Sequence, residues 1–294
     1  MDDSRDALAE QIRSIEDGRA FVDRSSFHLV GVGGGDARRW LNDLVTAAVE
    51  PLAPGQSCRS LLLSPTGRIR ADIQILASGD AFVLAQDPRQ PRPIDELLAP
   101  YVLSADVRME ALAGRVLLCA PGGGAPPPET AREDVFAPSM LGGGFDLLVG
   151  EGRRADAARA MLPRRLVTED AVREWRIRRG VPTFGVDLDE SSLPAEGGLE
   201  EDTVDFTKGC FLGQESVAKL RNLGHPPWVA LGLVADGPVE SGEELSAAGV
   251  EVGRITSVSH GDGQPGSTRV LARVRWEARE RSLVAPGGVR LVRP

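Results

Sequence analysis

The stretch FTKGCFLGQE, residues 206–215, decides how the rest of the sequence is interpreted. It places Cys210 between two glycines, Gly209 and Gly213. Glycine adopts backbone angles that are closed to other residues, so the segment predicts a tight turn with free backbone amides. A helix is expected to begin near Gly213. Three interpretations are open at this point: a reactive thiol, a ligand clamp and a simple turn.

The chemistry of Cys210 depends on its neighbours. A thiol close to a helix N-terminus and beside Lys208 feels two positive influences that favour the thiolate, whereas Glu215 opposes them. Nucleophilic catalysis by a cysteine normally also needs a base such as histidine. The chain has only three histidines, of which His225 is the nearest in sequence. The sequence therefore argues against a self-contained thiol hydrolase.

A second candidate residue lies upstream, in the long and weakly periodic segment 183–209. Glu196 stands in LPAEGG, between a proline and two glycines. Such a carboxylate either caps a turn or points into a cavity, and residue chemistry leaves both alternatives open. A carboxylate in a cavity is well suited to accept the paired N–H donors of a planar amino-heterocycle such as a pterin.

Length and composition limit the possible classes of protein. At 294 residues the chain is long enough for two or more packed units, and its 41% apolar residues are typical of a globular protein. The net charge of −9 argues against binding through nucleic-acid phosphates or anionic lipid. The N-terminus is acidic and no run of 18 apolar residues occurs, so we expect no signal peptide, no membrane span and a cytoplasmic location.

The three cysteines are far apart and form no C-x-x-C pair. This spacing predicts neither a disulfide framework nor a metal site. Cys58 and Cys119 stand in apolar, strand-like surroundings, and we expect both in or near the core.

The chain divides into three regions. Residues 1–21 predict an amphipathic helical arm, and 22–227 alternate irregularly between strands and helices. From residue 228 the pattern changes to short β-like runs separated by glycine-rich turns, which predicts a small β-barrel over 228–294. Within the middle region, 120–131 is rich in glycine and proline and predicts a surface loop.

Two smaller patterns bear on function. Residues 69–75 alternate, with isoleucines on one face and Asp72 on the other, polar face of a strand. A helix around Trp175 carries four arginines. We interpret these as a solvated helix face rather than as a basic binding patch; they are Arg173, Arg176, Arg178 and Arg179.

The glycine-framed segment resembles the signature K-G-C-[FY]-x-G-Q-E of the YgfZ-type folate-binding proteins, which are relatives of the glycine-cleavage T-protein. The resemblance extends from about residue 22 to the C-terminus and includes TGRIRADIQI at 66–75, RIRRGVP at 176–182 and LPAEGGL at 193–199. It implies an α+β, T-protein-like fold, in which mixed α/β units surround a central folate cavity and a small antiparallel β-barrel follows.

The resemblance also implies a function. The expected role is to support the assembly or repair of iron–sulfur enzymes, including tRNA-modifying ones, with tetrahydrofolate as cofactor and those enzymes as transient partners. Cys210 would be the functional thiol, with Lys208 as its partner and Asp72 as the remaining catalytic group. The residues implied to contact folate are Glu196, Gly209, Gly213, Gln214 and Glu215.

Two departures weaken an alternative function, aminomethyl transfer to tetrahydrofolate. T-proteins carry paired acids where this chain has Ala71 and Asp72, and an acid where it has Arg178. Aminomethyl transfer needs a carboxylate at the reacting nitrogens, and Asp72 alone remains for it. A third alternative is a docking protein that no longer binds folate.

Overall fold

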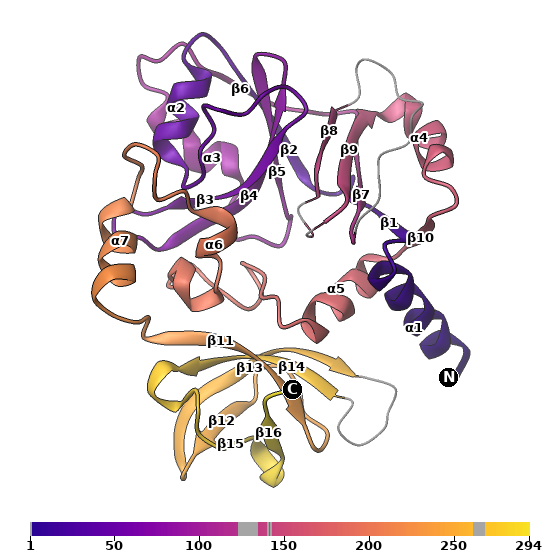
Figure 1. Cartoon of the computed structure of the whole chain (residues 1–294), viewed down its shortest axis with the longest axis vertical. Coiled ribbons are helices and arrows are strands. Elements are labelled where there is room, and N and C mark those ends of the chain that lie inside the picture. Colours follow the sequence, from indigo (N-terminus) through magenta and orange to yellow (C-terminus); the bar gives the residue numbers. More distant parts are fainter. Residues whose placement is uncertain (1, 123–134, 140, 142, 261–267) are drawn as a thin grey trace.

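The computed structural model describes residues 2–122, 135–139, 141, 143–260 and 268–294. Figure 1 shows two sheets side by side, with a barrel below them and helices α5, α6 and α7 between the sheets and the barrel. The described residues form mixed α/β units followed by a closed β-barrel. The predicted fold class is therefore confirmed. From residue 123 onward the predicted loop 120–131 lies outside the described residues.

The first sheet has the strand order β10-β1-β7-β9-β8. Strands β1 and β10 are parallel, and the other neighbours are antiparallel. Its strands are β1 (Ala20–Asp23), β7 (Arg115–Ala120), β8 (Val135–Pro138), β9 (Phe145–Gly150) and β10 (Arg165–Val167).

The second sheet is antiparallel, in the order β3-β4-β5-β2-β6. Its alternation is the predicted one: Ile69, Ile73 and Ile75 are fully buried, whereas Asp72 lies on the other face. Its strands are β2 (His28–Gly33), β3 (Ser57–Leu63), β4 (Ile69–Ser78), β5 (Ala81–Gln86) and β6 (Arg108–Ala111).

The barrel closes in the order β11-β14-β13-β12-β15-β16 around its own apolar core. Closure leaves no free sheet edge. Its strands are β11 (Trp228–Ala235), β12 (Glu244–Ala247), β13 (Val250–His260), β14 (Thr268–Arg275), β15 (Leu283–Val284) and β16 (Arg290–Val292).

The helices cover the sheets and connect them to the barrel. Ile12 and Ile15 of the N-terminal helix pack in one buried cluster with Trp175 of α5, so the N-terminal arm is part of the core. No helix among the described residues is long and apolar enough to cross a bilayer. The α-helices are α1 (Asp2–Glu16), α2 (Ala37–Leu44), α3 (Ile94–Leu98), α4 (Arg154–Ala160), α5 (Glu169–Arg178), α6 (Glu200–Thr203) and α7 (Gln214–Leu223), and short 3-10 turns include η3 (Pro194–Gly197).

A buried network attaches the barrel to the segment after α5. Arg176 Nη1 donates to Asp187 Oδ2 at 2.6 Å, and both side chains are nearly inaccessible. The other oxygen, Asp187 Oδ1, accepts hydrogen bonds from Thr256 at 2.7 Å and Ser257 at 2.6 Å, both on β13. A buried carboxylate with this many donors fixes the barrel relative to α5.

Candidate functional site

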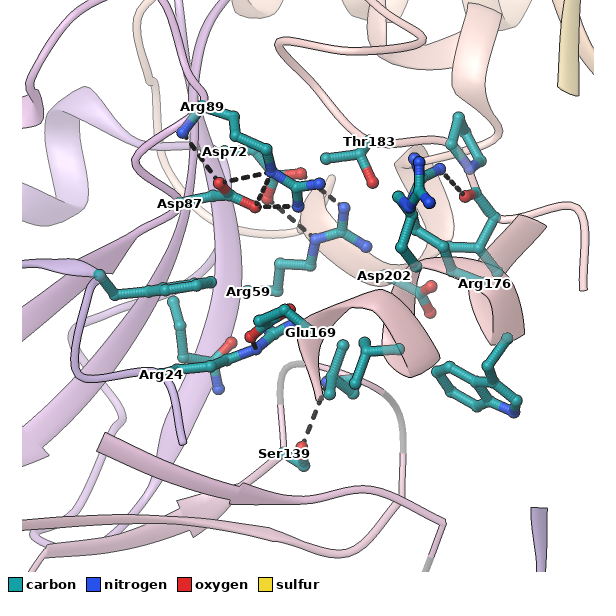
Figure 2. Close-up of a pocket in the computed structure, with 18 of the residues that line it drawn as sticks. Arg24, Arg59, Asp72, Asp87, Arg89, Ser139, Glu169, Arg176, Thr183 and Asp202 are labelled. Atoms are coloured by element: carbon teal, nitrogen blue, oxygen red, sulfur yellow. Dashed lines mark hydrogen bonds and ion pairs between the residues drawn. The ribbon is translucent and has the colours of Figure 1, made fainter. Parts of the chain in front are cut away.

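A cavity of about 440 Å³ lies where the two sheets meet α5. Its volume is within the range of small-molecule binding sites. The apolar part of its wall includes Phe27, Val172 and Trp175, and the charged part contains six arginines and four carboxylates. Figure 2 shows charged side chains converging on it from both sheets and from α5. The charged lining residues are Arg24, Arg59, Asp72, Asp87, Arg89, Glu169, Arg173, Arg176, Arg179 and Asp202.

Asp72 is held in the cavity wall by a bidentate ion pair (Figure 2). Arg59 Nε donates to Asp72 Oδ1 at 2.9 Å, and Arg59 Nη2 donates to Asp72 Oδ2 at 2.5 Å. The hairpin of β3 and β4 produces this pair. Arg59 is paired with Gln74, two residues from Asp72, and diagonal neighbours lie on the same sheet face.

Asp87 and Arg89 form a second pair just after β5. Arg89 donates through Nε at 3.0 Å to Asp87 Oδ1 and through Nη2 at 2.5 Å to Asp87 Oδ2. Burial acts to raise the pKa of Asp87, but the hydrogen bonds from Arg89 outweigh it and hold this pKa below its ordinary value. Asp87 is therefore ionised at neutral pH.

The first sheet and α5 are joined by a third pair. Arg24, which is 5% exposed, donates through Nε to Glu169 Oε1 at 2.8 Å, at the first residue of α5.

Arg176 is also buried, at 6% exposed, in its pair with Asp187. The interpretation of the α5 arginines as a solvated face is therefore wrong for Arg176. A buried carboxylate on a neighbouring segment makes its burial possible.

The cavity wall also contains a thiol. Cys58 is half-buried on β3 and lines the cavity, and burial raises its pKa to about 12. It is therefore a neutral thiol at physiological pH and an inert one. Cys119 is fully buried in the first sheet, as expected.

Lys208 binds to the end of another element. Its ammonium donates to the carbonyl oxygen of Asn42 in the last turn of α2. It also donates to those of Val45, at 2.7 Å, and Ala47, at 2.9 Å, just after this helix. An ammonium has three N–H donors, so all of them are used. Burial lowers the pKa of Lys208 to about 8. The residue ties the 206–215 segment to the second sheet unit.

The remainder of the motif lies outside the cavity lining. Cys210 is the exposed cysteine of the three. Gly213 is the N-cap of α7 with φ of 83°, and the next two residues, Gln214 and Glu215, open that helix. Gly209 has no heavy atom within 4 Å of where a Cβ would lie, and its φ is outside the left-handed region. Only Gly213 of the pair therefore needs to be glycine for its conformation.

Glu196 is completely buried in η3 and contacts the barrel. Its Oε2 accepts a hydrogen bond from Arg273 Nη2 on β14 at 2.8 Å, and Arg68 Nη1 lies 3.7 Å from its Oε1. Burial raises the pKa of Glu196, although Arg273 opposes this shift. The carboxylate thus lies between the barrel and the sheet units rather than in the lining of the cavity.

Of the eight site residues predicted from the sequence, Asp72 alone lines the cavity. Lys208, Cys210 and the start of α7 form a second location, and Glu196 a third. The roles predicted for these residues in folate binding and thiol chemistry stay predictions. Sequence reasoning missed the paired arginines of the cavity, and a signal existed for one of them, because the predicted hairpin places Arg59 on the face of Asp72.

Within the described residues, no group of three or more histidine, cysteine or acidic side chains is arranged to hold a metal ion.

Comparisons with known proteins give distant relatives. No protein-family model matches the chain. A chloroplastic protein of Arabidopsis thaliana, provisionally named as a transferase, is 24% identical over 286 residues, covering 87% of this chain and 66% of the relative. The chain thus spans slightly less than two thirds of that relative. A Haemophilus influenzae protein of unassigned function is 25% identical over 212 residues, with 69% of each chain covered.

A solved structure is similar over nearly the whole chain. The glycine cleavage system aminomethyltransferase T of Bartonella henselae matches with a TM-score of 0.77 and 19% identity, covering 98% of this chain and 88% of the other. The match includes the sheets, the intervening helices and the barrel. The chain has the fold of the glycine-cleavage T-protein.

Proposed function

We propose that the chain binds a tetrahydrofolate in the central cavity and acts as an accessory protein for iron–sulfur enzymes, including tRNA-modifying ones. Cys210 would act on the surface as the functional thiol. The observation that carries the proposal is a cavity of about 440 Å³ within a fold shared with an aminomethyltransferase T. The K-G-C-F-x-G-Q-E match at 208–215 favours the accessory role.

The lining of the cavity fits the parts of a folate. Phe27, Val172 and Trp175 provide an apolar wall for a flat ring system. Asp72 uses one lone pair on each oxygen for Arg59, so each oxygen can still accept an N–H from a pterin. The arginines complement the carboxylates at the other end of the molecule.

The state of Asp72 argues for the accessory role over group transfer. A general base needs a carboxylate that is free to accept a proton. Both oxygens of Asp72 already accept hydrogen bonds from Arg59, so a proton taken up by this carboxylate would have to compete with the ion pair. The provisional name of the Arabidopsis relative keeps aminomethyl transfer as the alternative function.

Anaerobic calorimetry with tetrahydrofolate tests the cavity. We expect saturable binding to the wild type and at least about tenfold weaker binding to Thr183→Trp, because an indole in place of this half-buried lining side chain fills the cavity. Val186→Trp is the matched control. Val186 is an exposed neighbour outside the lining, so its replacement should leave the affinity unchanged.

The titration, combined with an assay of ammonia release, separates the three alternative functions. Absence of binding to the wild type would remove the folate proposal and favour the docking protein. Binding together with ammonia release from an aminomethyl-lipoyl carrier, lost in Asp72→Asn, would replace the accessory role by aminomethyl transfer.

The thiol role is tested in a strain that lacks the chain. We expect Cys210→Ser to restore iron–sulfur enzyme activity at least about tenfold less well than the wild type, because a serine hydroxyl lacks the nucleophilic and redox chemistry of a thiol. Cys210 is exposed, so its replacement should leave the thermal unfolding midpoint unchanged. Full restoration by Cys210→Ser would rule out a thiol function.

A further inference from the structure

We propose that Thr46 is a positioning residue for Cys210. It sets the carbonyl oxygens that bind Lys208, and it joins the turn 206–213, which carries Cys210 and is called the thiol turn below, to elements of the cavity wall. The inference rests on the proposed function for the role of the Cys210 thiol. Thr46 lies between α2 and β3, outside both the cavity lining and the 206–215 motif.

The backbone on either side of Thr46 holds the start of the thiol turn. The ammonium of Lys208 donates to Val45 O at 2.7 Å and to Ala47 O at 2.9 Å. The carbonyl of Thr46 itself lies between these two in sequence and accepts a hydrogen bond from Asp205 N at 3.0 Å. Successive carbonyls of the segment 45–47 thus bind the chain just before the turn and the lysine within it.

The side chain of Thr46 fixes the backbone of the segment 45–47. Thr46 has no exposed surface. Its Oγ1 donates to Thr203 O at 2.6 Å and accepts from Leu61 N at 2.9 Å, while its own backbone N–H donates to Leu61 O at 3.0 Å. A buried hydroxyl whose proton and lone pair are both engaged holds one orientation, so Thr46 is locked between α6 and β3.

A second buried hydroxyl supports the same segment. Ser60 on β3 has no exposed surface, and its Oγ accepts a hydrogen bond from Ala47 N at 2.8 Å. The same oxygen lies 3.3 Å from Thr46 Oγ1. The carbonyls of the segment 45–47 are therefore held by side chains as well as by backbone pairing.

The partners of Thr46 adjoin the cavity. Ser60 directly follows Arg59 on β3, and Thr203 directly follows Asp202 on α6. Arg59 and Asp202 both line the cavity. Thr46 therefore binds the elements that form one part of the cavity wall and, through its neighbours, the lysine of the thiol turn.

The position of Cys210 depends on how firmly its neighbours are held. The thiol is exposed, whereas Lys208 on one side is bound to the carbonyls around Thr46. Phe211 on the other side is 6% exposed and packs in one buried cluster with Leu61, the residue that is hydrogen-bonded to Thr46. An accessible side chain between two anchored ones is presented in a fixed place, as a group that reacts with a partner requires.

Hydrogen exchange of the amides of residues 204–214 tests the inference without any ligand. Thr46→Val keeps the shape of the side chain and removes its hydroxyl, and we expect these amides to exchange about fivefold faster. Thr46→Ser keeps the hydroxyl and should stay within about twofold of the wild type. Lys208→Met removes all three N–H donors and should have at least the effect of Thr46→Val.

Ile255→Val is the control for a general loss of stability. Ile255 is fully buried in the core of the barrel, and removing one methyl group there destabilises the protein by an amount comparable to the loss of a hydrogen bond. It does not alter the segment 45–47, so the exchange of residues 204–214 should match the wild type. Equal acceleration in Ile255→Val and Thr46→Val, or wild-type exchange in Thr46→Val, would overturn the inference.

The double variant shows whether Thr46 acts through Lys208. Once Lys208→Met has removed the ammonium, Thr46→Val should accelerate exchange by less than about a further twofold. Effects that multiply in full would mean that the two residues act independently, and would contradict the proposed route.

Activity in the strain that lacks the chain provides the functional measurement. At equal protein levels, we expect Thr46→Val to restore iron–sulfur enzyme activity at least about threefold less well than the wild type, with Thr46→Ser and Ile255→Val restoring it fully. Faster exchange with full restoration by Thr46→Val would show that the position of the turn does not matter for activity, and would overturn the inference. Full restoration by Cys210→Ser would instead remove the proposed thiol function, and the exchange data alone would then decide whether Thr46 orders the turn.

Discussion

Replacing Arg273 by methionine is expected to lower the free energy of unfolding by about 3 kcal/mol. Arg273 is the hydrogen-bonding partner of Glu196, a carboxylate with no exposed surface. Without it the charge of Glu196 would stay buried, with only Arg68 at 3.7 Å as compensation. Removing one member of a buried ion pair costs more than the pair itself contributes. Urea unfolding followed by circular dichroism measures the loss.

Arg275→Met is the matched control on the same strand. Arg275 is exposed, two residues away on β14, and its guanidinium also stacks on Trp228, as that of Arg273 does. Its replacement removes the same charge and a similar stacking contact without leaving a carboxylate buried. We expect a loss below about 1 kcal/mol. Equal losses in the two variants would show that Glu196 does not depend on Arg273.

The pH dependence of the loss tests the contribution of Glu196, since the other carboxylate bound by Arg273, that of Asp189 at 3.0 Å, is half exposed. Burial raises the pKa of Glu196 above its ordinary 4.5, so the folded state retains a proton that the unfolded state releases. The contribution of Glu196 to the free energy of unfolding is fully present below its unfolded-state pKa of 4.5. This contribution is lost as the pH rises through the pKa of the folded state. Removing Arg273 raises the folded pKa further. The deficit of Arg273→Met should therefore be small near pH 4.5 and complete at neutral pH.

The elements that the sequence predicts well are those determined by local pattern. Alternation over 69–75 gives the buried face of β4 correctly, because one strand has only two faces. The change of pattern after residue 227 predicts the barrel for a similar reason. The fold class follows from these patterns and from the motif at 206–215 together.

The site depends on contacts that local pattern does not contain. Arg24 and Glu169 are 145 residues apart, and Glu196 meets Arg273 across 77 residues. Nothing near any of these residues in sequence marks its partner, so the α5 arginines look solvated and Glu196 looks free to face a ligand. The paired charges become visible only when the topology brings both sheets and the barrel together.

The motif illustrates the same limit at short range. Lys208 and Cys210 are two residues apart, yet the ammonium donates to one carbonyl in the last turn of α2 and to two just after this helix, while the thiol is exposed. Adjacency in sequence therefore does not give the two side chains the same surroundings. It means an anchor beside an accessible side chain.

The second large effect is expected for Gly213→Ala. Gly213 has φ of 83°, and an added Cβ would lie 2.5 Å from the carbonyl oxygen of Ser64 and 3.0 Å from the Cβ of Leu63. The left-handed conformation costs a residue with a Cβ about 1–2 kcal/mol, and the steric conflict adds to it. We expect the free energy of unfolding to fall by about 2–4 kcal/mol in urea unfolding.

The backbone of Ser64 cannot easily move away from the added methyl group. Its carbonyl accepts the hydrogen bond from Gly67 N at 2.9 Å that closes the β3–β4 turn, and a Cβ on Gly67 would itself lie 2.8 Å from Ser216 on α7. Gly209→Ala is the control in the same motif and should change stability by less than about 0.5 kcal/mol. Equally large losses of stability in Gly209→Ala and Gly213→Ala would mean that the motif needs both glycines. A selective effect of Gly213→Ala would mean that the motif keeps this glycine so that α7 can pack against the β3–β4 turn, with Cys210 presented just before it.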